Sequence, residues 1–138
     1  MPRLSIRYYR VSAEKVLETL RQIFASIPEV KIAVLFGSLR RRELVRDVDI
    51  GVYLDPKPNL KEFIRLANML EDALGIPVDL VPLDRAPPKL RLKALSEGEK
   101  VVVRDRKLYA FMISEALSET MDIDIKLREE RMLTSKSR

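Results

Sequence analysis

Residues 34–54 read VLFGSLRRRELVRDVDIGVYL and join two apolar runs through a glycine-serine turn and a basic segment. Asp47 and Asp49 stand at the head of the second apolar run. In a β-strand, successive side chains point to opposite faces, so these two aspartates emerge on one face, about 7 Å apart along the chain. On a helix, the same spacing turns them roughly 200° apart. Strand geometry here predicts a pair of carboxylates that can share a hard cation.

The local pattern predicts two strands joined by a short connection. The nearly continuous apolar run over residues 30–36 indicates a buried strand that ends at Gly37 and Ser38. A short basic helix is expected to continue to about Leu44, followed by a second strand over residues 47–54. Because the connection is short, we expect the two strands to be antiparallel.

The next elements bring a third aspartate toward this pair. Asn59 and Glu62 form a capping-box-like pair at the start of a helix, and Gly75 stands where the glycine after a helix belongs. A third strand is predicted over residues 77–83, with Asp79 near its beginning. Since a helix long enough for a crossover separates the second and third strands, we expect them to be parallel, with their amino ends together. Asp79 then lies near the first two aspartates if the strands are neighbours.

The remaining sequence predicts helices that flank the sheet. Residues 1–11 fit either a short edge strand or an extended arm. Ser12 is expected to cap a helix that Pro28 closes. Further on, we expect a helix over residues 90–97, a short strand over 100–104, a long helix from about Lys107 and a frayed tail over 133–138. The whole chain, residues 1–138, is expected to form one α/β domain with a mixed sheet.

Composition limits the available chemistry. The 138 residues include 26 basic and 21 acidic side chains, for a net charge of +5, and neither cysteine nor histidine. Any metal site must therefore use carboxylates, which narrows the ion to magnesium, manganese or calcium. No secretory signal or membrane-spanning run is present, so we expect a cytoplasmic protein. The scarcity of side-chain amides beside abundant Glu, Lys and Arg is typical of thermophiles.

The candidate site combines carboxylates with groups that bind phosphate. Asp47, Asp49 and Asp79 are suitable ligands for one or two magnesium ions. Gly37 lets the backbone approach a phosphate, and Ser38 offers a donor to its oxygens. Arg41 and the basic residues around it add positive charge. Each feature alone has an ordinary structural explanation, but their order predicts the handling of a nucleoside triphosphate. Asp122 and Asp124 repeat the Asp-x-Asp spacing within a predicted helix, so we assign them no site.

With LFGS at residues 35–38, DVD at 47–49 and VDLV at 78–81, the chain resembles the minimal nucleotidyltransferases. These are single-domain members of the superfamily that includes DNA polymerase β and kanamycin nucleotidyltransferase. The resemblance implies a mixed sheet flanked by helices, with Asp47 and Asp49 as magnesium ligands and Gly37 and Ser38 at the triphosphate of ATP. It also implies that Asp79 is a third carboxylate, which acts as a base or as a metal ligand.

Small members of this family are commonly antitoxins whose partner is a helical HEPN ribonuclease toxin. The resemblance therefore implies a hetero-oligomer in which this chain transfers AMP from ATP to a tyrosine hydroxyl of the toxin. One alternative is an inactive antitoxin that binds and occludes the toxin, because arginines replace the glycine and serine common at positions 42 and 46. A small-molecule nucleotidyltransferase is a third alternative. We expect no membrane contact and no direct action on nucleic acid, since the chain lacks a platform of aromatic and basic residues.

Overall fold

The computed structural model describes residues 7–37 and 44–136, without the side chains of residues 135 and 136. Ten elements follow one another along this part of the chain. They are β1 (Tyr9–Arg10), α1 (Ala13–Ala25), β2 (Val30–Phe36), β3 (Leu44–Val45), β4 (Val48–Leu54), α2 (Leu60–Leu74), β5 (Val78–Pro82), α3 (Pro88–Glu97), β6 (Glu99–Val103) and α4 (Arg106–Lys136).

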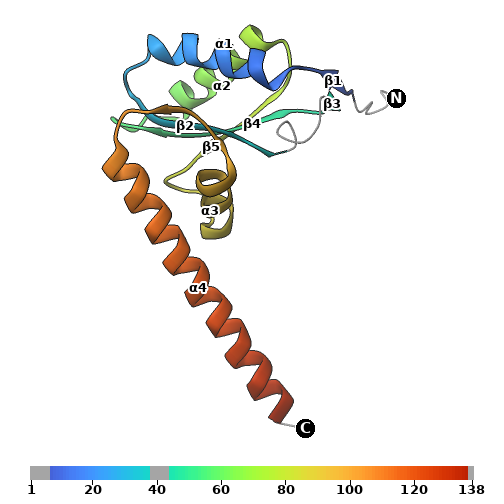
Figure 1. Ribbon diagram of the computed structural model, residues 1–138, viewed down its shortest axis with the longest axis vertical. Helices are drawn as coiled ribbons and strands as arrows, with labels where there is room; N and C mark the ends of the chain where they lie inside the picture. The colour runs from blue at the N-terminus through green and yellow to red at the C-terminus, as the bar shows by residue number, and fades with distance from the viewer. Residues whose placement is uncertain (1–6, 38–43, 137–138) are drawn as a thin grey trace.

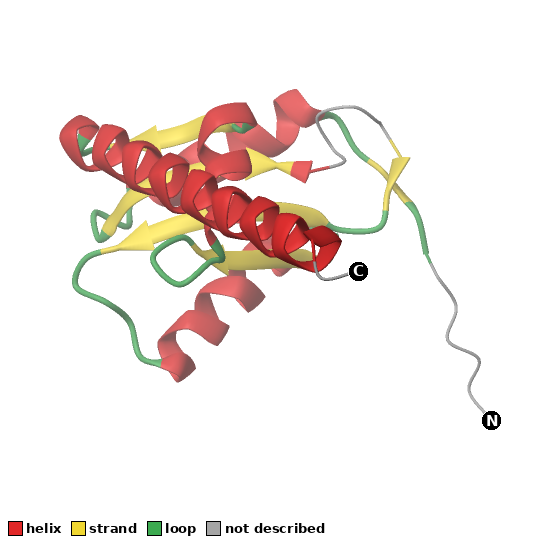
Figure 2. Cartoon of the chain, turned by 90° about the horizontal axis from the view of Figure 1, so that it is seen from below, coloured by secondary structure: helices red, strands yellow, loops and turns green. Residues whose placement is uncertain are grey.

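The main sheet has four strands in the order β5-β4-β2-β6. β2 is antiparallel to both of its neighbours, whereas β4 and β5 are parallel. The mixed sheet and both strand orientations confirm the predictions from connection length. β1 and β3 form a separate antiparallel pair beside the main sheet (Figure 2).

Helices cover both faces of the main sheet (Figure 1). α1 and α2 pack on one face, where Leu20 and Leu70 meet the β4 side chains Val48 and Ile50. α3 and α4 pack on the other face, where Leu95 belongs to a second cluster of buried apolar side chains. The alternation of side chains along each strand supplies both cores, so the sheet is buried from both sides.

Helix α2 shows how local sequence sets its ends. The backbone N–H of Glu62 donates to the Asn59 side-chain oxygen over 2.8 Å, as the capping pattern predicts. At the other end, Gly75 has a left-handed φ of 71° and its N–H donates to the Glu71 carbonyl. These caps fix α2 as the crossover that makes β4 and β5 parallel.

Several predicted boundaries differ from the structure. Leu44 lies in β3, paired with Arg10, so the short helix does not reach it, and the rest of that predicted helix lies outside the described residues. Asp47 precedes β4, since sheet pairing on this side begins with the Val48 N–H bond to the Pro77 carbonyl. Ser12 occupies the cap position of α1 without a side-chain bond to the backbone.

Helix α4 is much longer than the surface that it covers. Tyr109 and Met112 are buried in one cluster with side chains of α3 and the sheet, and Ala116 is also buried. From residue 121 to residue 134, every residue is exposed, and the helix extends away from the domain (Figure 1). Its helical backbone continues to Lys136, into the stretch that was expected to fray. No helix in the described part of the chain is long and apolar enough to span a membrane.

Candidate active site at the sheet edge

Asp49 and Asp79 lie side by side at the amino ends of two parallel strands. β4 and β5 pair in register, with Val48 opposite Val78 and Asp49 opposite Asp79. Residues opposite one another on neighbouring strands are about 4.8 Å apart and point to the same face of the sheet. Sheet pairing therefore holds these two carboxylates together without a contribution from loops.

Gly37 closes the other side of this carboxylate pair. It follows β2, whose last residue Phe36 pairs with Asp49. Gly37 has a φ of 83°, which L side chains rarely adopt, and a Cβ at this position would overlap the Asp49 carboxylate. The glycine thus allows the backbone turn and also leaves room for the carboxylate.

The electrostatic environment of Asp49 is strongly unfavourable to its negative charge. Partial burial, the negative charges of Asp47 and Asp79 and a hydrogen bond with Asp79 raise the pKa of Asp49 to about 6. The positive charge of Lys93 opposes this shift. Neighbouring carboxylates that repel one another in this way form a site where a cation is favoured.

The donor chemistry of this site fits a magnesium ion. Among the residues that the structure describes, no group of three or more acidic, histidine or cysteine side chains is gathered closely enough to hold a metal by itself. Magnesium, however, usually takes one or two carboxylates and completes its shell with water and phosphate oxygens. Asp49 and Asp79 supply such a pair, and the charge of Asp47 acts on it from the preceding loop.

Sequence reasoning found most of these groups and missed one. Asp47, Asp49, Asp79 and Gly37 come together, whereas Ser38 and Arg41 lie outside the described residues. Lys93 was missed. It lies on α3, and no pattern in the sequence indicates that this helix brings a cation close enough to act on Asp49.

The second Asp-x-Asp pair is placed as expected for residues without a site. Asp122 and Asp124 both lie in α4, outside the sheet. Asp124 pairs with Lys89 of α3 over 3.4 Å, with both side chains more than half exposed. This aspartate therefore has a structural partner.

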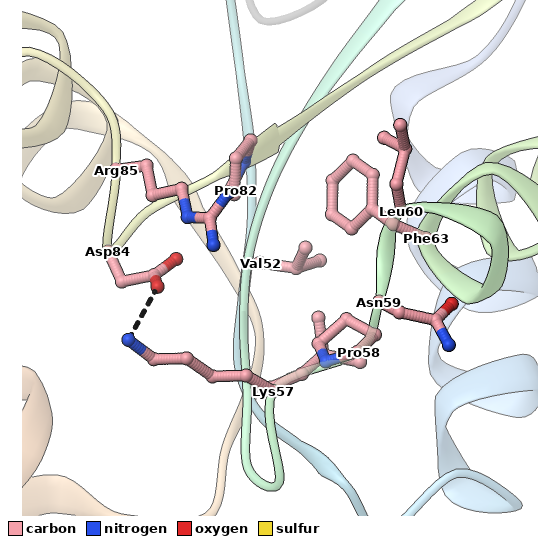
Figure 3. A pocket seen from close by; sticks show the side chains of 10 residues that line it. Val52, Lys57, Pro58, Asn59, Leu60, Phe63, Pro82, Asp84 and Arg85 are labelled. Carbon is pink, nitrogen blue, oxygen red and sulfur yellow. Dashed lines mark ion pairs between the residues drawn. The ribbon is translucent and has the colours of Figure 1, made fainter.

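A cavity of about 260 Å³ lies at the opposite end of β4 and β5 (Figure 3). Val52, Phe63 and Pro82 form part of its apolar wall. An ion pair between Lys57 and Asp84, 3.2 Å long, lies at its side (Figure 3). Since the cavity adjoins the carboxyl ends of the strands, it is not part of the carboxylate site at their amino ends.

The sequence around this site matches a known protein family. The family described as polymerase beta nucleotidyltransferase matches residues 18–107. This region includes β2, β4 and β5 and therefore all three aspartates of the site. No curated protein sequence matches the chain.

Several solved structures with a similar fold come from toxin–antitoxin complexes. A chain of the MntA–HepT toxin–antitoxin complex is 19% identical, with a TM-score of 0.65, and the match covers 91% of this chain and 99% of that chain. A toxin–antitoxin structure with AMP-PNP gives 21% identity, a TM-score of 0.67 and coverage of 88% and 98%. A third match is to a complex of the tri-AMPylated HEPN toxin with its MNT antitoxin, from Shewanella oneidensis. It has 22% identity and a TM-score of 0.60, and it covers 91% of this chain and 95% of that chain. At these identities, the likeness shows the fold.

Proposed function

The chain belongs to the polymerase β nucleotidyltransferase family, and on this premise we propose that it transfers AMP from ATP to a hydroxyl group of a helical HEPN-domain toxin. The acceptor is a tyrosine side chain, and the transfer neutralises the toxin. The neighbouring structures support the choice of substrate and partner, because one contains AMP-PNP and another contains an AMPylated HEPN toxin beside an MNT antitoxin. The two proteins act as a hetero-oligomer.

The single observation that carries this proposal is the register of β4 and β5, which sets Asp49 against Asp79. Two adjacent carboxylates, with a third close enough to act on them, suit the binding of a cation and the acceptance of a proton. Gly37, directly against Asp49, leaves backbone rather than side chain at the place where a phosphate has to approach.

The reaction is a displacement at the α-phosphorus of ATP. The acceptor oxygen forms a bond to this phosphorus while the bond to the bridging oxygen of the β-phosphate breaks. Pyrophosphate leaves with the bond electrons, and the hydroxyl proton passes to a carboxylate, for which Asp79 is suited by its exposure at the strand end.

Asp47, Asp49 and Asp79 are the residues that would hold magnesium in this reaction. The bound ion would neutralise charge on the phosphate oxygens. Lys93 adds a fixed positive charge beside Asp49, which limits the repulsion between the carboxylates when no substrate is present.

The test is to incubate the protein with ATP, magnesium and the HEPN protein encoded beside it, and then to measure the intact mass of that partner. We expect a gain of one or more AMP units, at least 100-fold slower with Asp49→Asn or Asp79→Asn. Asp72→Asn, on the exposed side of α2, is the matched control and keeps the wild-type rate. An unmodified partner under these conditions contradicts the proposal.

A second candidate function is binding and occlusion of the toxin without transfer. The observation that favours it is the pair of arginines at positions 42 and 46, where a glycine and a serine are common in this family. In that case, the toxin forms a tight complex of unchanged mass, and Asp49→Asn inhibits it as well as the wild type does. These two results separate occlusion from catalysis.

A further inference from the structure

The projecting half of α4 carries a large apolar surface that the domain does not use. Leu117, Met121, Ile125 and Met132 are between 47% and 59% exposed, and they recur at spacings of four, four and seven residues. Such spacing keeps them on one side of a helix. Tyr109, Met112 and Ala116, which bind the helix to the domain, lie on the other side.

This half of the helix also lacks the support that helices normally need. Every residue from 121 to 134 is exposed, so no tertiary packing holds this part in place. Isolated helical segments of about this length are marginal in water, and most helical stability in proteins comes from packing of an apolar face. An exposed apolar face on an unsupported helix indicates that another helix packs against it.

The charges on α4 indicate which helix packs against it. Between residues 114 and 125, all charged side chains are acidic, whereas basic side chains prevail between residues 126 and 136. The acidic set is Glu115, Glu119, Asp122 and Asp124, and the basic set is Lys126, Arg128, Arg131 and Lys136. A second copy of α4 in the antiparallel direction thus brings each half against a half of opposite charge.

The match holds at the level of single residues. About a two-fold axis at Ile125, Asp122 of one copy lies opposite Arg128 of the other. In the described part of the chain, neither of these two side chains takes part in an ion pair. A parallel pair of helices instead sets like charges against one another, which is destabilising.

We propose that α4 forms an antiparallel two-helix interface with the α4 of a second copy of this chain, centred on Ile125. Residues 114–136 of the two copies overlap over about 34 Å of helix. Each copy buries its exposed apolar side chains between the helices, and the charged pairs fix the direction and the register. The interface is independent of the AMP-transfer site, which lies at the edge of the main sheet.

The absence of cysteine from the chain makes the register directly measurable. Single-cysteine variants are treated with a short bifunctional maleimide. We expect Ile125→Cys to cross-link to itself, and Leu117→Cys and Leu133→Cys to cross-link only when the two are mixed. Lys61→Cys, exposed on α2, reports random collisions. Self-linking of Leu117→Cys and Leu133→Cys, or linking of the α4 variants no faster than the control, overturns the proposal.

Charge reversal provides a second test on the uncross-linked protein. Light scattering across a concentration series should show a mass that rises from one chain toward two. Asp122→Arg should raise the dissociation constant at least tenfold, and Asp122→Arg combined with Arg128→Asp should restore it. Surface changes on this projecting segment leave the domain folded, which circular dichroism verifies. A mass of one chain at every concentration, or a combined variant no tighter than the single one, overturns the proposal.

Discussion

At the scale of the residue, the Asp49 carboxyl group holds the most distinctive environment in the site. Burial and the charges of Asp47 and Asp79 raise its pKa to about 6 from an ordinary value of 3.8. A group whose pKa is raised by folding stabilises the folded protein below its unfolded pKa, and this contribution is lost as the pH rises through the folded value.

This linkage predicts the pH dependence of the magnesium-free protein. Between about pH 4 and pH 6, the free energy of unfolding should fall by about 1–2 kcal/mol, after allowance for solvent screening at this half-buried site. Asp49→Asn should remove that dependence. Urea unfolding at a series of pH values, with carbon-detected NMR titration of the Asp49 carboxyl, measures both. An Asp49 resonance that titrates near pH 4 contradicts the prediction.

Gly37→Ala tests the contact between the glycine and the carboxylate. Both the positive φ and the overlap with Asp49 oppose a Cβ here, so we expect about 1–2 kcal/mol of lost stability and at least a tenfold loss of AMP transfer. Gly75→Ala is a matched control, because Gly75 has a φ of 71° with nothing within 4 Å of the added Cβ. It should lose similar stability and keep its activity. Equal loss of activity in both variants would refute the contact.

The residues of the site differ in how well the sequence predicts them. Asp49 and Asp79 are the second residues of β4 and β5, and Asp47 directly precedes β4. Period-two alternation with a crossover helix is enough to bring these strand starts together. Lys93 acts on Asp49 through the packing of α3 on the sheet, and this packing depends on side chains far apart in the chain. Local patterns carry no such information.

At the scale of the element, the junction of α3 and α4 depends on one buried cation. The Arg91 guanidinium donates to the carbonyls of Leu83 and Ala86 over 2.9 and 3.0 Å, and pairs with Glu115 of α4 over 3.3 Å. The Arg91 side chain therefore joins the end of the sheet, the loop before α3 and the terminal helix.

Arg91→Ala should lower the free energy of unfolding by about 2–4 kcal/mol, because it leaves buried carbonyl groups without donors. Lys89→Ala removes an exposed ion pair to the same helix and should cost less than about 1 kcal/mol. Urea unfolding of both variants gives the comparison. Equal losses would show that the buried hydrogen bonds contribute nothing beyond an ordinary surface pair.

The elements with strong local signals agree with prediction, and those fixed by distant pairing do not. β2 begins and ends where its apolar run does, and α2 has the caps that Asn59 and Gly75 predict. β3 is only two residues long and exists through its pairing with β1, more than thirty residues earlier. Its sequence, Leu44–Val45, is too short for any periodicity to be recognised.

At the scale of the whole molecule, we expect the domain to fold without the projecting half of α4. A chain that ends after Thr120 loses residues that are exposed in the monomer. At a protein concentration low enough to keep the chain monomeric, its free energy of unfolding should therefore change by less than about 1 kcal/mol. A chain that ends after Asp105 also loses Tyr109 and Met112 from the core and should not fold. Thermal unfolding followed by circular dichroism distinguishes them. Strong destabilisation of the longer truncation contradicts this division.

The claim that the three aspartates form one magnesium and nucleotide site is tested most directly by paramagnetic NMR. Manganese replaces magnesium in the presence of a non-hydrolysable ATP analogue, and the broadening of each backbone amide is recorded. We predict that broadening is centred on Gly37, Asp49 and Asp79 and is abolished by Asp49→Asn. Broadening centred on Asp84 near the cavity or on Asp122 in α4, with the amides of the sheet edge unchanged, would contradict the account.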